Sequence, residues 1–136
     1  MALSKALRVA SFAVLAAAAL NACIAGINGS VDVRSGETRD RATSINGGVN
    51  VGDNAKVGEA STVNGAIRMG ERATADSVKT VNGSVQILDK SRVSNDVVTV
   101  NGGIQLASGV DVGGSVRNVN GAIRLVVADV GGDIST

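Results

Sequence analysis

The dipeptide Asn-Gly recurs at a nearly constant interval along this chain, and that interval constrains the fold more than any other feature. Successive copies are separated by 18, 18, 18, 19 and 19 residues. Their asparagines are Asn28, Asn46, Asn64, Asn82, Asn101 and Asn120. In every copy Ile or Val precedes the Asn, and Ser, Gly or Ala stands two places after it. A fixed period of this length indicates a repeat architecture, in which each unit buries its apolar side chains against its neighbours.

Within each unit, the residues three and five places after the Asn are apolar and the residue between them is polar, as in Ile67-Arg68-Met69. This alternation predicts a strand with one buried face. The second half of each unit carries valines separated by Gly, Asp and Ser, for example Val93 and Val97, and indicates further short strands joined by turns. The fold class predicted for 28–136 is all-β.

Two architectures accommodate such units. The first is a single-stranded β-solenoid of the parallel β-helix type, with about six coils of 18–19 residues whose equivalent residues stack about 4.8 Å apart. The second is a meander or barrel in which each Asn-Gly is a hairpin turn. We favour the solenoid, because a meander does not require the same residue at each strand position.

In a solenoid the six asparagines form a structural ladder of stacked amides, with a ligand site as the alternative interpretation of that column. Each Asn-Gly is expected to make a sharp corner with left-handed backbone angles.

Residues 1–22 have the pattern of a secretory signal. Lys5 and Arg8 precede an apolar run from Val9 to Leu20 that only Ser11 interrupts. This run is too short for a bilayer span but suits a signal helix. The single cysteine, Cys23, follows at once, and an unpaired thiol in a secreted protein calls for an explanation. A plain signal peptide with an incidental cysteine and a short buried helix are the alternatives.

The segment Leu20-Asn21-Ala22-Cys23 resembles the bacterial lipoprotein box. The resemblance implies cleavage before Cys23, lipidation of Cys23 with diacylglyceryl and palmitate chains, and a membrane partner reached through that lipid. Ile24, in place of the Asp that would imply inner-membrane retention, implies sorting to the outer membrane. The expected organisation is a signal peptide at 1–22, a lipidated N-terminus and short tether at 23–27, and the solenoid domain at 28–136.

The last unit repeats the one before it at a shift of 18 residues and stops at Thr136, where a seventh Asn-Gly would begin. Terminal repeats usually cap the open end of a stack, and no such cap is visible in the sequence. We therefore expect either a solenoid truncated at its C-terminus or an end that docks onto another chain, that is, self-association through the solenoid ends.

Composition argues against several function classes. The chain has no His, Trp, Tyr or Pro and a formal net charge of +1. Without His it lacks the commonest general base and metal ligand, and without Tyr and Trp it lacks the usual side chains for stacking on sugars and bases. The small net charge provides no basic excess to bind nucleic acid. Carboxylates such as Asp32 with Glu37, or Asp129 with Asp133, stand at different places in different units and are interpreted as solvated surface. We predict no catalytic residue, no metal, no cofactor and no nucleic-acid partner, and the sequence specifies no small-molecule ligand.

The recurring Val-Asn-Gly-small-Ile-x-apolar unit, from about residue 26 to the end, resembles bacterial adhesin-like domains of the head GIN type. The resemblance implies a non-enzymatic cell-envelope protein with a β-solenoid-like fold, acting as a structural or adhesin-like scaffold. The alternative is a self-assembling, polymer-forming solenoid similar to the bactofilins.

Overall fold

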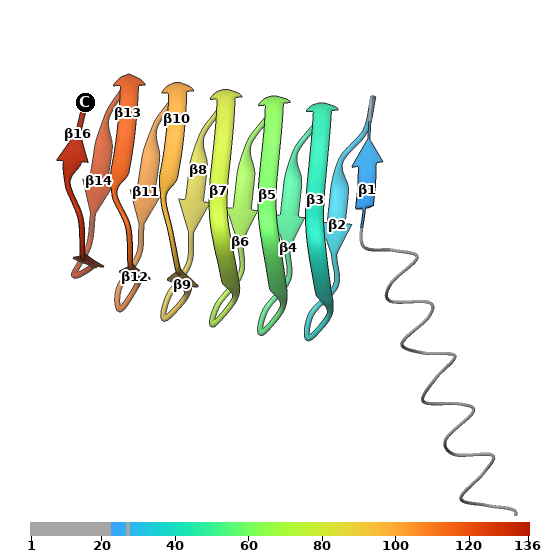
Figure 1. Cartoon of the computed structure of the whole chain (residues 1–136), viewed down its shortest axis with the longest axis horizontal. Coiled ribbons are helices and arrows are strands. Elements are labelled where there is room, and N and C mark those ends of the chain that lie inside the picture. Colours follow the sequence, from blue (N-terminus) through green and yellow to red (C-terminus); the bar gives the residue numbers. More distant parts are fainter. Residues whose placement is uncertain (1–22, 27) are drawn as a thin grey trace, which may run out of the picture.

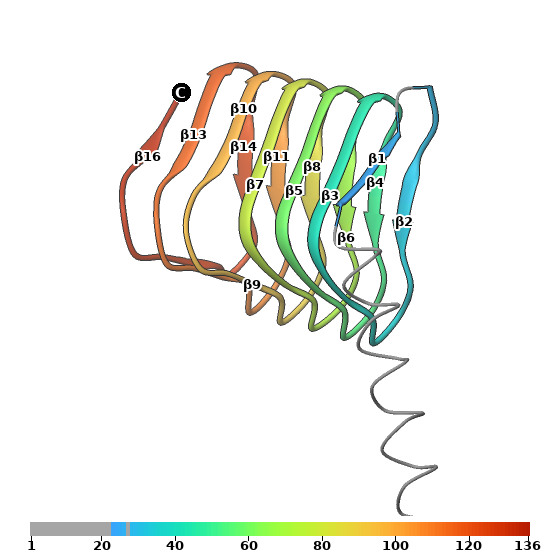
Figure 2. The same ribbon diagram turned by 45° about the vertical axis from the view of Figure 1, so that its right-hand side comes forward.

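The computed structural model describes residues 23–26 and 28–136, so the predicted signal segment 1–22 lies outside the described residues. The described chain is all-β and winds as a solenoid of parallel strands (Figures 1 and 2). Every strand pairing in this part of the chain is parallel, for example β3 with β5 and β4 with β6. This confirms the predicted solenoid and excludes the meander of hairpins, whose neighbouring strands would be antiparallel.

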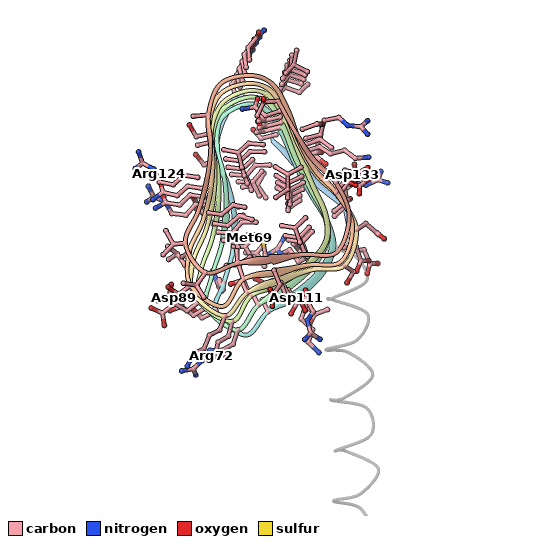
Figure 3. The ribbon with its side chains drawn as sticks, turned by 90° about the vertical axis from the view of Figure 1, so that its left-hand side faces the viewer. Met69, Arg72, Asp89, Asp111, Arg124 and Asp133 are labelled. Carbon is pink, nitrogen blue, oxygen red and sulfur yellow. The ribbon has the colours of Figure 1, made fainter. Side chains whose placement is uncertain are left out.

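Each coil contributes to two sheets. Sheet A contains β1 (Cys23–Gly26), β3 (Thr38–Asn46), β5 (Lys56–Asn64), β7 (Thr74–Asn82), β9 (Arg92–Val93), β10 (Val97–Asn101), β12 (Asp111–Val112), β13 (Val116–Asn120), β15 (Asp129–Val130) and β16 (Ile134–Ser135). Sheet B contains β2 (Val31–Val33), β4 (Val49–Val51), β6 (Ile67–Met69), β8 (Val85–Ile87), β11 (Ile104–Leu106) and β14 (Ile123–Leu125). A view along the axis shows a pear-shaped section (Figure 3). We call its narrow end, where sheet A meets sheet B after each Asn, the apex, and its wide end the base.

The register keeps equivalent residues opposite one another, so Asn46 pairs with Asn64 and Asn64 with Asn82. The two longer intervals in the sequence have a local structural cause. Ala75 pairs with Val93 and Val78 with Val97, so two residues of β7 face three residues of the next coil. The extra residue bends the chain and divides the long strand into β9 and β10, as a β-bulge does. Because the insertion is absorbed there, Asn101 remains opposite Asn82.

Columns of aliphatic side chains fill the interior. The residues three and five places after each Asn are buried from Val31 and Val33 through to Ile104 and Leu106, because branched side chains on the inner face of each strand stack on their equivalents in the next coil. The buried residues of sheet A, such as Val78 and Val97, complete the core.

Two features of the structure add detail to the sequence predictions. Within the segment 23–27, which is expected to hold the lipidated N-terminus and a short tether, Cys23–Gly26 form β1, which pairs with β3 in the register Cys23 opposite Arg41. Left-handed backbone angles are expected at Asn-Gly, and they occur there in two copies, where φ is 153° at Gly102 and 145° at Gly121. The asparagines of the second to sixth copies end extended strands of sheet A. A regular column of left-handed angles, which the sequence did not indicate, lies at the opposite corner, where φ is between +49° and +71°. The residues there are Gly36, Asn54, Arg72, Lys90, Gly109 and Val127.

Candidate functional site

The asparagines of the repeat form a continuous side-chain ladder on the outside of the apex. The amide of Asn46 donates to Oδ1 of Asn28 at 3.1 Å, and that of Asn64 donates to Oδ1 of Asn46 at 3.0 Å. Three further bonds of 2.9 Å extend the series through Asn82 and Asn101 to Asn120. The amides thus satisfy one another along the axis, and a structural role accounts for all six.

A second column at the apex, which the sequence analysis missed, is buried and hydroxyl-rich. Thr62, two places before its Asn, donates its hydroxyl proton to the carbonyl oxygen of Gly47 at 2.8 Å. Ser44, Thr80 and Thr99 make the same bond to the preceding coil, at distances from 2.8 to 3.1 Å. Ser or Thr recurring at this position was the available signal. The bonds satisfy backbone acceptors that the sharp corner leaves without a sheet partner.

From the second copy onward, the glycine of Asn-Gly is required by close approach between coils. A Cβ at Gly83 would collide with the carbonyl oxygen of Gly65, and one at Gly65 would collide with that of Gly47. Gly29 differs, because a Cβ there would meet no atom of the described residues within 4 Å. The repeated glycine is therefore needed for stacking and not for a ligand.

From the second copy onward, the residue before the Asn, always Ile or Val, faces outward. Ile45, Val63, Val81 and Val119 have 44%, 41%, 40% and 57% of their surface exposed, and Val100 is partly exposed. These five residues, which we call the apex stripe, lie beside the Asn ladder on sheet A. The sequence pattern did not indicate which way they face, because alternation alone does not identify the core side of a strand that turns a corner.

One charged residue occupies an interior column. Arg39 pairs with Val57, and the equivalents of Val57 in the next coils, Ala75 and Val93, are buried. Nη2 of Arg39 lies 2.7 Å from Oε1 of Glu37, and only 9% of the Arg39 side chain is exposed. Its Nε and Nη1 are buried without a hydrogen-bond partner in the described part of the chain.

Glu37 is held by two neighbours. The backbone N–H of Arg34 donates to its Oε2 at 2.9 Å, and this bond is the main reason that the pKa of Glu37 lies below its usual value. Partial burial opposes the shift, and the guanidinium of Arg39 supports it.

The remaining polar residues are distributed over the surface. Asp32 accepts a bond of 2.7 Å from Asn50, and Arg68 donates to Gln86 at 3.2 Å, along the outward column of sheet B. Asp32 and Glu37 therefore bind different partners. Figure 3 shows Asp89, Arg72 and Asp111 around the base and Arg124 and Asp133 on opposite sides. Among the described residues no group of three or more Cys, Asp and Glu is arranged to hold a metal ion.

Cys23 lies in β1 at the edge of sheet A. No helix in the described part of the chain is long and apolar enough to cross a membrane.

Comparison of the chain with models of protein families, with curated proteins and with solved structures finds no match.

Proposed function

We propose that this protein is a non-enzymatic lipoprotein of the bacterial cell envelope, anchored in the outer membrane through Cys23 and acting as a structural or adhesin-like scaffold. The observation that carries the proposal is that the recurring polar residues and glycines of the unit have structural uses: the asparagines bond to one another, the hydroxyls bind backbone carbonyls, and the glycines permit close stacking. A chain whose recurring polar residues and glycines build the stack presents an extended, regular surface, and such a surface suits a scaffold.

The anchor follows from the position of the only cysteine directly after a short apolar run. Two or three acyl chains on one residue hold a protein firmly, whereas a single chain binds only weakly. Because β1 begins at Cys23, such an anchor would leave almost no free chain between the lipid and the folded domain.

Cys23→Ser tests the proposal. Wild-type protein expressed in a Gram-negative host should partition into the detergent phase and sediment with outer membranes, and its N-terminal peptide should carry the mass of the acyl chains. The variant should appear in the aqueous phase. Equal partitioning of the two forms would reject the anchor.

The polymer-forming alternative predicts that coils of different molecules stack end to end. Arg39, with its buried guanidinium in the first complete coil, disfavours that arrangement at one end, because an inward-pointing charge obstructs edge-to-edge pairing. Analytical ultracentrifugation of the acyl-free domain separates the two functions: a monomer at high concentration rejects the polymer.

A further inference from the structure

The apex stripe is an exposed apolar surface with regular geometry. Its five β-branched residues occupy the same place in five consecutive coils. Four coil steps of about 4.8 Å give a length of about 19 Å. A shallow groove of about 370 Å³ lies along it, lined by stripe residues together with Val98 and the aliphatic parts of Thr43 and Lys79. A contiguous apolar patch of this kind on a protein surface is often functional.

The charges beside the stripe have one sign. The outward column next to it on sheet A consists of Thr43, Ser61, Lys79, Val98 and Arg117. On its other side the Asn ladder is neutral. Over these three columns the only charged residues among those described are therefore Lys79 and Arg117, both cationic. Aliphatic surface bordered by long cationic side chains complements the interface of an anionic bilayer, where such side chains extend towards the headgroups.

The size of the surface argues against a protein partner. Three columns over 19 Å present on the order of 300 Å² per molecule, well below the roughly 800 Å² per partner of a stable interface. A contact of that size is useful only when something else holds the two surfaces together, because tethering raises the effective concentration of the second contact.

Sheet A also contains the proposed anchor. Cys23 pairs with Arg41, four residues before Ile45 in the same strand. At about 3.3 Å per residue the anchor lies some 13 Å along the sheet from the level of the stripe. We propose that the apex stripe rests on the lipid surface that the Cys23 acyl chains enter, so that the solenoid axis lies parallel to the membrane. This inference rests on the proposed lipid anchor and adds a second contact to it. The base, with Arg72 and Lys90, then faces away from the membrane.

The test uses lipidated, full mature protein in vesicles of phosphatidylethanolamine and phosphatidylglycerol. An environment-sensitive dye is attached to a second cysteine, introduced either by Val81→Cys in the stripe or by Arg72→Cys at the base; both positions are exposed, and acylated Cys23 does not react with the dye. We expect a blue shift and severalfold stronger quenching by bilayer-embedded quenchers at position 81, with neither at position 72. Neutral phosphatidylcholine vesicles should reduce the shift, because Lys79 and Arg117 lose their anionic partners.

Three outcomes overturn the inference in distinguishable ways. If the protein floats with the vesicles but the dye at position 81 stays as accessible to water as at position 72, the anchor stands and the stripe does not dock. If the blue shift disappears when the protein is diluted to one molecule per vesicle, the stripe covers a second copy of the chain. If the wild type does not float with vesicles, the anchor fails and the inference with it.

Discussion

Asn118 donates an amide hydrogen bond to the carbonyl oxygen of Gly102 at 2.9 Å, in the place where four earlier coils use a hydroxyl. Asn118 is buried, and its Oδ1 has no partner among the described residues. The larger side chain thus reproduces the donor of Ser or Thr and adds an acceptor that the interior does not satisfy.

Asn118→Thr should therefore stabilise the domain. Removing a buried, unsatisfied acceptor while keeping a donor should raise the free energy of unfolding by about 1 kcal/mol. Urea titration followed by circular dichroism measures the change. The reciprocal variant Thr99→Asn should lower stability by a similar amount, and stabilisation by both would contradict this account of the column.

Gly83→Ala should be strongly destabilising, because the new Cβ would collide with a backbone carbonyl that has no room to move. We expect a loss of about 2 kcal/mol or more, in the range of overpacked interiors. Gly29→Ala is the matched control in the same motif, with open space around its Cβ. Equal melting temperatures for the two variants would mean that the glycine column is not needed for stacking.

Val127→Gly should stabilise the protein. Val127 has φ of 49° and is 84% exposed, and the same corner has glycine at Gly36 and Gly109. A β-branched residue in this conformation is strained by roughly 1–2 kcal/mol, and part of that gain is offset by the backbone entropy of glycine. A net gain of about 0.5–1 kcal/mol should appear in thermal melts. Val126→Gly, at a neighbouring exposed position without a positive φ, should give no gain.

Ile67→Asp should unfold the domain and Arg68→Asp should not. Ile67 is fully buried, and an unpaired charge in its place is strongly disfavoured. Arg68 faces outward and makes one exposed bond to Gln86, so its replacement should change stability by about 0.5 kcal/mol or less. Ile104→Asp should behave as Ile67→Asp does. If all three variants had similar melting temperatures, the assignment of inner and outer faces would be wrong.

Acid should weaken the first complete coil through Glu37. Its pKa is lowered in the folded protein from an ordinary value of 4.5, so the folded state favours the ionised form. That contribution to stability is fully present above the unfolded pKa and is lost as pH falls through the lower folded pKa. Glu37→Gln should flatten the pH dependence of stability below about pH 4.5 and destabilise the protein at neutral pH, where Arg39 loses its partner. An unchanged acid profile would contradict the role of this pair.

The sequence predicted the fold class, the coil length and the inner face of sheet B, because these depend on local alternation and on identity between units. It located the Asn column, but positive φ occurs in only two of the Asn-Gly copies, at Gly102 and Gly121, since Asn-Gly permits those angles without requiring them. Arg72 and Lys90 adopt them with no compositional signal. The direction of the apex stripe and the inward position of Arg39 depend on where each strand crosses the corner, and only the three-dimensional register determines that.

The uniform register has a consequence for how the chain folds. Each strand pairs with residues 18 or 19 positions away, so forming each new coil closes a loop of nearly the same length and the same entropic cost. Folding can then begin at any well-formed pair of coils and extend in both directions, each finished coil serving as the template for the next. Because each coil contacts only the coils on either side of it, a defect weakens its own coil and those two neighbours more than the rest of the stack.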